Sequence, residues 1–196
     1  MNDKREIYLL DTNAYFNFMR YSTHALGDGD SFDVAVSQIK AADCCISQIS
    51  LIEIISVLGK YARGKSAGKE KCNCIIDDAG TICPHYKVIQ GRKRWSNKRK
   101  KAWIKYFDEI KSGTSSLLKV RILPLDNEVW REAEKIIPLS MEYKFASLDA
   151  LIAATARTEQ SKSGTRSFTV VTSDKSLKCA LSKCSIPIWD AFQVTH

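Results

Sequence analysis

The sequence predicts an α/β fold of three layers, in which helices cover both faces of a small parallel sheet. Short apolar runs alternate with helical stretches along the chain, an alternation typical of strand–helix–strand units. A second observation is that turn-forming and helix-capping residues directly follow apolar runs, as Asp-Thr-Asn follows Ile7–Leu10. The length of 196 residues suits a single domain over 1–196, interrupted by an insertion at about 63–95.

Five short strands are predicted from runs of apolar, β-branched and aromatic residues. They cover residues 7–10, 44–47, 120–125, 167–172 and 186–189. Helices are predicted from apolar periodicity and capping residues. They cover residues 14–20, 32–41, 51 onward, 95–111, 127–137, 147 onward and a short stretch after 174, with a loop at 27–30. The expected caps are Ser31, Ser50 in a capping box with Glu53, Asp126 and Ser147.

Positive charge is concentrated in one part of the chain. The formal net charge is +8, but residues 60–105 hold 14 Lys and Arg against three acids. This segment therefore carries +11 and the remainder −3. A basic patch so localised favours a polyanionic partner.

The cysteine count and the apolar runs exclude other classes of protein. Seven cysteines, an odd number, argue against a disulfide framework, and adjacent Cys44 and Cys45 are expected to be small core residues. No apolar run approaches the roughly 20 residues that cross a bilayer. The N-terminal segment has no secretory-signal pattern. We therefore expect a cytoplasmic protein with no membrane partner.

Four acidic residues are candidates for a shared site. Asp11 and Asp174 each follow a predicted strand, and such strand ends carry the sites of parallel α/β sheets. Glu53 and Asp149 each lie in the first turn of a predicted helix. Each acid also has a structural interpretation, because Asp11 and Asp174 could be N-caps, Asp149 a first-turn acid and Glu53 half of a capping box.

Convergence of the four acids would point to a metal ion. Close carboxylates repel each other unless a cation neutralises them, and Mg²⁺ or Mn²⁺ prefers oxygen ligands. Such ions support phosphodiester hydrolysis without a nucleophilic side chain. The three histidines are scattered and form no HExxH or similar pair, namely His24, His85 and His196.

Four strings in this sequence resemble motifs of the PIN-domain nucleases. Residues 9–13, Leu-Leu-Asp-Thr-Asn, look like the strand that opens the family, and residues 50–53 resemble the helix bearing its second acid. Residues 147–156 resemble its third-acid helix, and residues 170–174 its Thr-x-Asp strand end. The four strings occur in the family's order and cover most of the chain outside the insertion.

The resemblance implies a metal-dependent endoribonuclease that cuts RNA with Mg²⁺ or Mn²⁺. It implies metal ligation by Asp11, Glu53, Asp149 and Asp174, with Thr12, Asn13 and Thr172 as supporting groups. VapC-like toxins are the nearest-looking members, which implies an antitoxin-like inhibitor protein as partner and a homodimer as assembly. The alternative is a non-catalytic PIN-like module that binds RNA or assembles a complex.

The insertion contains a candidate zinc site that the resemblance does not cover. Cys72, Cys74, Cys83 and His85 form a C-x-C-x8-C-x-H pattern, four ligands suited to tetrahedral Zn²⁺. The usual pair spacing is C-x2-C or wider, so unligated loop cysteines are the alternative.

A basic, aromatic segment adjoins the insertion. Cations and aromatic rings together can neutralise phosphates and stack on unpaired bases, and Trp103 and Tyr106 extend the pattern. The expected RNA-binding residues are Arg92, Lys93, Arg94, Trp95, Lys98, Arg99, Lys100 and Lys101. The alternatives are a solvated helix face or a surface that an acidic antitoxin masks.

Overall fold

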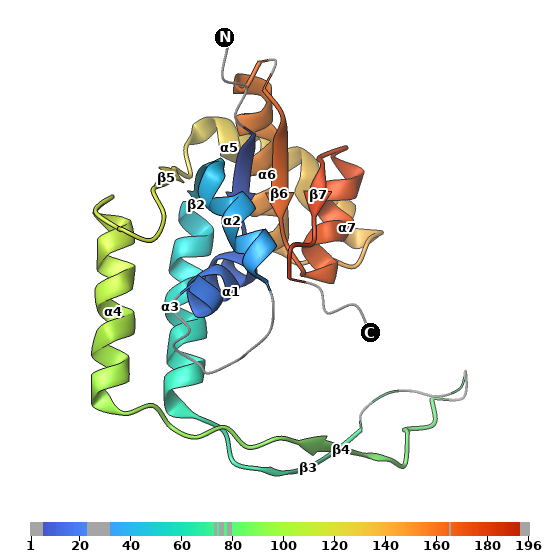
Figure 1. Cartoon of the computed structure of the whole chain (residues 1–196). Helices are drawn as coiled ribbons and strands as arrows, with labels where there is room; N and C mark the ends of the chain where they lie inside the picture. The colour runs from blue at the N-terminus through green and yellow to red at the C-terminus, as the bar shows by residue number, and fades with distance from the viewer. Residues whose placement is uncertain are drawn as a thin grey trace. The chain divides into compact units, whose positions relative to one another are not determined.

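The computed structural model describes residues 6–22, 32–72, 74, 77, 80–164 and 166–192. The predicted loop at 27–30 and the Ser31 cap lie outside these residues. The chain divides into two compact units, the first made of Met1–Ile54 with Tyr106–His196 and the second of Ile55–Lys105 (Figure 1). None of the described helices is both long enough and apolar enough to cross a membrane.

The first unit is built on a five-stranded sheet, and every strand pair in it is parallel. This confirms the predicted parallel sheet. In spatial order the strands are β5 (Val120–Leu123), β2 (Asp43–Ser47), β1 (Ile7–Leu10), β6 (Phe168–Val171) and β7 (Ile188–Trp189). All four residues of the central strand β1 are buried, as expected for a strand covered on both faces. Cys44 and Cys45 are buried in β2, which confirms them as core residues.

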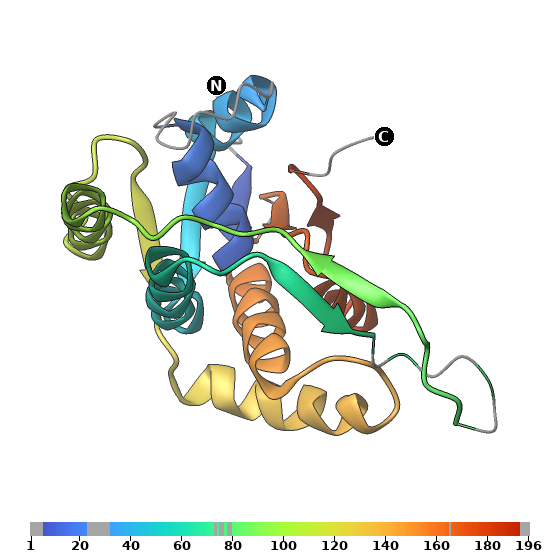
Figure 2. The same cartoon turned by 90° about the horizontal axis from the view of Figure 1, so that it is seen from below.

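Helices cover both faces of this sheet, so the predicted three-layer architecture is confirmed. One face carries α1 (Thr12–Ser22) and α2 (Asp33–Ala41), and the other carries α5 (Asn127–Ile136), α6 (Ser147–Lys162) and α7 (Lys175–Lys183) (Figures 1 and 2). A 3₁₀ turn, η1 (Ile137–Met141), follows α5. Ala150, Ala153 and Ala154 of α6 are completely buried, and their small side chains allow close packing against the sheet.

Two of the predicted helix caps are wrong, by three residues and by one, and a third, Asp126, is correct. Helix α3 (Gln48–Arg63) starts earlier than predicted, and Ser47 caps it by accepting a 2.9 Å bond from the Ser50 amide. Helix α6 is preceded by Ala146, so Ser147 is not its cap. The carboxylates of Asp126 and Asp174 do cap α5 and α7. The Ser50–Glu53 capping box is therefore not formed, and Glu53 is engaged elsewhere.

The second unit contains an antiparallel hairpin of β3 (Gly68–Lys71) and β4 (Tyr86–Ile89). It also includes the end of α3 and the start of α4 (Asn97–Lys111). Gly64 begins the hairpin with φ of +74°, and a Cβ there would stand 2.6 Å from the Arg92 carbonyl oxygen. Only glycine meets both conditions without strain.

A small aromatic cluster stabilises the second unit. Trp95 and Trp103 stack with their ring centroids 5.5 Å apart, and Tyr61 lies 6.4 Å from Trp95. The guanidinium of Arg92 lies over Tyr61 and that of Arg99 over Trp95. Both tryptophans are buried, at 6% and 2% exposure. These rings are therefore structural.

Candidate functional site

Asp11 lies at the carboxyl edge of the sheet, directly after the central strand β1. Strand β1 pairs with β6 in parallel with Leu10 opposite Val171, so Asp11 and Thr172 leave the sheet side by side. The Thr172 hydroxyl donates a 2.5 Å bond to Oδ2 of Asp11, and the Ala14 amide donates one of 2.5 Å to Oδ1. The second bond caps helix α1. Asp11 is thus fixed by both neighbours and is only 2% exposed.

The surroundings of Asp11 disfavour its ionised form. Burial raises the pKa of this carboxyl to about 7, against the opposing effect of the bonds from Thr172 and Ala14. The negative charges of Asp174 and Glu53 raise the pKa further. No cationic side chain is among these influences, so the ionised form of Asp11 is unfavourable beside its two acidic neighbours. A bound cation would offset the repulsion between the carboxylates.

Glu53 is held toward this edge by Thr12. The Thr12 hydroxyl donates a 2.6 Å bond to Oε2 of Glu53, although the residues are 41 positions apart. Thr12 is buried directly after Asp11, and Glu53 is partly exposed on α3. The bond links the acid of α3 to the end of β1. Asn13, the other predicted supporting residue of this motif, is exposed.

Asp174 and Asp149 lie at the N-termini of the two helices beside this edge. Asp174 accepts bonds from the Ser176 and Leu177 amides, and its own amide donates to the Thr172 hydroxyl. Asp149 accepts a 2.8 Å bond from the Ala146 amide. Burial first, and then the charge of Asp174, raises the pKa of Asp149. Asp174 therefore acts electrostatically on both Asp11 and Asp149.

The four acids form one electrostatically linked group, in the order Glu53, Asp11, Asp174 and Asp149. In the described part of the chain, no three acidic, histidine or cysteine side chains already surround one point that a metal ion could occupy. The donor set still suits a hard divalent cation, because it consists of carboxylate oxygens whose mutual repulsion a cation removes. Ligation would need rotation of the side chains toward a common point.

Asp190 is an acid at this edge that the sequence analysis did not identify. It follows β7 directly, as Asp11 follows β1, and that position after a strand was the available signal. Its carboxylate accepts a bond from the Ser173 hydroxyl and forms an ion pair with Lys178. Since Lys178 compensates its charge, Asp190 positions the loop that carries Asp174.

The predicted RNA-binding segment is only partly available to a ligand. Trp95 was expected to contact RNA, but it is buried against Trp103, so neither ring can stack on a base, and that prediction is wrong. Arg92 is held by Tyr61 and donates a 2.8 Å bond to the Lys60 carbonyl. Arg99 and Lys100 are partly buried. The exposed cations of the segment are Lys93, Arg94, Lys98 and Lys101.

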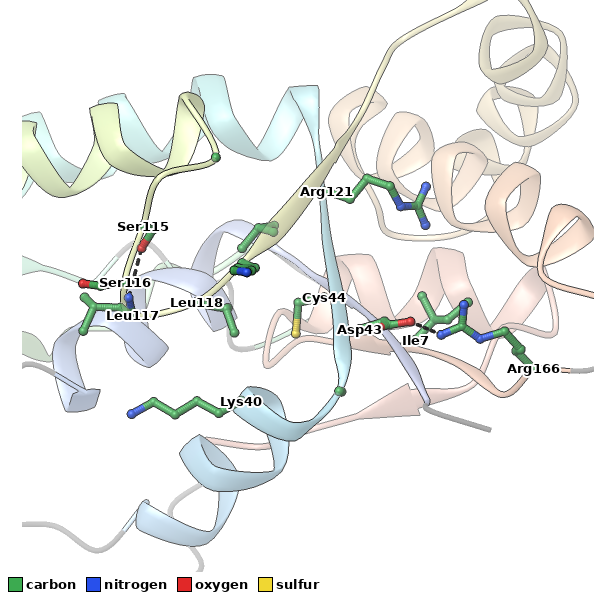
Figure 3. A pocket seen from close by; sticks show the side chains of 14 residues that line it. Ile7, Lys40, Asp43, Cys44, Ser115, Ser116, Leu117, Leu118, Arg121 and Arg166 are labelled. Atoms are coloured by element: carbon green, nitrogen blue, oxygen red, sulfur yellow. Dashed lines mark hydrogen bonds and ion pairs between the residues drawn. The ribbon is translucent and has the colours of Figure 1, made fainter. Parts of the chain in front are cut away.

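A pocket of about 720 Å³ lies at the opposite edge of the sheet (Figure 3). Its lining includes the first residues of β1, β2 and β5, whereas the four acids lie beyond the carboxyl ends of the strands. Asp43 and Arg166 form an ion pair at its border. The pocket is therefore separate from the acidic site.

Comparison with solved structures supports the same fold. FitAcB from Neisseria gonorrhoeae superimposes with a TM-score of 0.51 and 17% identity, over 95% of this chain and 99% of that chain. DNA-bound VapBC from Salmonella typhimurium gives 0.51 and 18%, over 95% and 98%. VapBC2 from Rickettsia felis, bound to a DNA fragment from their promoter, gives 0.51 and 16%, over 94% and 99%.

Sequence comparison gives the family. A search of curated proteins finds no match to this chain. The profile of the PIN domain, however, matches residues 8–180, which include all four acids, the whole second unit and most of the first. That match extends over most of the sequence and agrees with the parallel sheet and its acidic edge. This chain belongs to the PIN-domain family, whose members are generally nucleases.

Proposed function

We propose that this chain is a divalent-metal-dependent endoribonuclease. The observation that carries the proposal is the linked group of four carboxylates around buried Asp11, whose pKa is raised to about 7. Family membership supports it, because PIN domains are generally nucleases and typically use divalent metals. The acids that would hold Mg²⁺ or Mn²⁺, directly or through water, are Asp11, Glu53, Asp149 and Asp174.

The residues around the acids have positioning roles in this proposal. Thr172 fixes the orientation of Asp11, and Thr12 holds Glu53 toward the same edge. Asn13 is exposed beside them and is proposed to orient water or substrate. A bound Mg²⁺ or Mn²⁺ supplies Lewis acidity and compensates negative charge during phosphodiester hydrolysis.

We further propose that the chain is the toxin of a toxin–antitoxin pair. The support is that the solved neighbours are FitAcB and VapBC, which are toxin–antitoxin complexes. An antitoxin-like inhibitor would then be the protein partner, and the protein is expected to act in the cytoplasm as a homodimer.

The test is cleavage of mixed RNA by the purified full chain. With Mn²⁺ or Mg²⁺ we expect endonucleolytic fragments, and with excess chelator we expect none. The double variant Asp11→Asn, Asp149→Asn should bind RNA as the wild type does, because the basic segment is unchanged, but should not cleave it. A parallel assay with single-stranded DNA of the same sequence tests whether the protein prefers RNA to DNA.

Equal RNA binding without cleavage by either protein, in every metal, would overturn the nuclease proposal. That outcome would support the alternative of a non-catalytic RNA-binding or assembly module. Cleavage of DNA in preference to RNA would support nuclease activity but contradict RNA as the substrate.

The exposed cations of the basic segment are proposed to bind the RNA backbone. Changing Lys98 and Lys101 to Gln removes two positive charges without touching the tryptophan stack. Because each phosphate contact on single-stranded nucleic acid contributes about 0.7 to the salt dependence, we expect weaker binding and a log–log salt slope smaller by about 1.4. Fluorescence anisotropy with a labelled RNA over a range of salt measures both.

The matched control is Lys40→Gln with Lys119→Gln, which removes two exposed lysines from the pocket at the other sheet edge. The control should keep the wild-type slope. If both double variants reduce the slope equally, the protein binds RNA through its overall charge, and the assignment to the basic segment is wrong.

A further inference from the structure

We propose that Cys72, Cys74, Cys83 and His85 bind one Zn²⁺, which holds together the hairpin of the second unit. This site is independent of the acidic edge and is not part of the proposed nuclease chemistry. The described residues of the hairpin offer little else to stabilise it. All four residues of β3 are exposed, and so are Val88 and Tyr86 of β4, at 69% and 60%. An isolated two-stranded hairpin is at best marginally stable in water.

The register of the hairpin places the four residues in two cross-strand pairs. The ladder pairs Gly68 with Ile89 and Lys71 with Tyr86. It continues beyond the strands, because the Cys72 amide donates a 2.9 Å bond to the His85 carbonyl and the Cys83 amide one of 2.8 Å to the Cys74 carbonyl. Cys72 is thus opposite His85, and Cys74 is opposite Cys83.

This arrangement explains the unusual ligand spacing. Successive side chains of an extended strand point to opposite faces, so residues two positions apart share a face. In the C-x-C and C-x-H pairs, each ligand is therefore on the same face of its strand as its partner. Directly opposed residues on a common face have Cβ atoms about 5 Å apart. A two-stranded ribbon therefore requires one residue between the ligands of each strand, instead of the two residues of the C-x2-C pattern.

Two of the four side chains are already in contact, and the other two lie near them. Sγ of Cys83 lies 3.2 Å from Nδ1 of His85, and Cys74 and Cys83 are near enough to Cys72 to influence the pKa of its thiol. Ligands at zinc distances of about 2.3 Å for sulfur and 2.0 Å for nitrogen stand about 3.5 to 3.8 Å from one another in a tetrahedron. The sulfur–nitrogen contact is within a few tenths of an ångström of that edge.

Only side-chain adjustment separates this cluster from a coordination sphere. Among the residues that the structure describes, no three such side chains yet enclose a common point. The backbone register is nevertheless fixed by paired amides and carbonyls, so rotation about the side-chain torsions suffices. Three thiolates and one imidazole around Zn²⁺ carry a net charge of −1, and Lys87 is close enough to act on the charges of Cys72 and Cys74.

Elemental analysis of the purified full chain tests the proposal. After removal of loosely bound metal we expect one zinc per chain, and none in Cys83→Ser. Cys83→His, which keeps a zinc ligand at this position, should restore binding. Cys179→Ser, which changes a partly buried cysteine of α7, is the matched control and should retain zinc.

Two further measurements separate this site from the acidic one. Zinc should remain in the Asp11→Asn, Asp149→Asn variant, whatever the outcome of the RNA assay. Co²⁺ in place of zinc should give the near-ultraviolet absorption of thiolate coordination. Removal of the metal should accelerate tryptic cleavage at Lys69, Lys71 and Lys87 by at least about tenfold, because the bound ion stabilises the hairpin by mass action.

Absence of stoichiometric zinc would overturn the proposal, whether the thiols are then free or joined in a disulfide. Zinc that disappears with the acidic double variant, or that Cys83→Ser retains, would also overturn it. Far-ultraviolet circular dichroism of Cys83→Ser should match the wild type, because most of the helices belong to the first unit. This excludes general unfolding as the cause of lost zinc.

Discussion

Asp174→Asn is expected to lower RNA cleavage by at least about a hundredfold, comparable to the loss of one charge-stabilising group in other active sites. Folding should be almost unchanged, because asparagine is as good an N-cap as aspartate and can still accept bonds from the Ser176 and Leu177 amides. The substitution removes only the negative charge that couples Asp11 to Asp149. Initial cleavage rates with Mn²⁺, together with thermal unfolding, measure the two effects.

Asp126→Asn is the matched control. Asp126 caps α5 through the same pair of bonds, to the amides two and three residues later, but the charge of Asp126 is not among the influences on the pKa of Asp11 or Asp149. This variant should retain full activity. Asp174→Ala should lose activity and also about 1 kcal/mol of stability, because the cap is lost. If Asp174→Asn cleaves RNA at the wild-type rate, Asp174 is a helix cap and nothing more.

The parallel sheet and the positions of Asp11 and Asp174 were predictable because their signals are local. A short apolar run followed by Asp-Thr-Asn identifies both β1 and the residue that leaves it. Parallel pairing then places Asp11 and Thr172 at one edge without further information. Asp11 and Asp174 are also N-caps, so their structural and proposed functional roles coexist rather than compete.

Glu53 illustrates what local reasoning could not supply. The Ser50–Glu53 spacing matches a capping box, but α3 starts earlier because the buried Ser47 hydroxyl accepts the Ser50 amide. The Glu53 carboxylate is therefore free of the cap and accepts a hydrogen bond from the hydroxyl of Thr12, 41 residues away. A contact of that separation depends on how α3 packs beside β1, which no periodicity encodes.

The tryptophans of the basic segment show a second limit of prediction from sequence. Cations interleaved with aromatic residues predicted a nucleic-acid surface, and the charges of Lys98 and Lys101 are exposed. The rings of Trp95 and Trp103 instead stack on each other and, among the described residues, are the buried apolar side chains of the second unit. Composition identified the charge correctly but could not decide which side of the segment faces water.

Between pH 4 and pH 8, the free energy of unfolding of the metal-free protein should fall through the titration of Asp11. The folded state binds the Asp11 proton more tightly than the unfolded chain does, since the pKa rises from 3.8 to about 7 on folding. The proton's stabilising effect is complete below pH 3.8, is lost progressively as the pH rises to about 7, and is absent above that. The difference between these two pKa values corresponds to about 4 kcal/mol of stability.

Asp11→Asn removes this titration while keeping an acceptor for the Ala14 amide. The variant should therefore lose about 4 kcal/mol less stability than the wild type over the same pH range, as measured by urea unfolding in chelator. The subtraction also removes the contribution of Asp149, which has the same sign and is common to both proteins. Identical pH profiles for the two proteins would show that Asp11 is not the buried, charge-disfavoured group inferred from the structure.

A divalent cation should reverse this loss of stability at high pH in the wild type. Binding to ionised Asp11 and its neighbours stabilises the folded state in proportion to the logarithm of the ion concentration above its dissociation constant. Mg²⁺ or Mn²⁺ should therefore raise the stability of the wild type at pH 8, raise it less at pH 5 where Asp11 is mostly protonated, and raise that of Asp11→Asn least. Since this dependence is read from unfolding and not from cleavage, it tests cation binding at the acidic edge even before an RNA substrate is known.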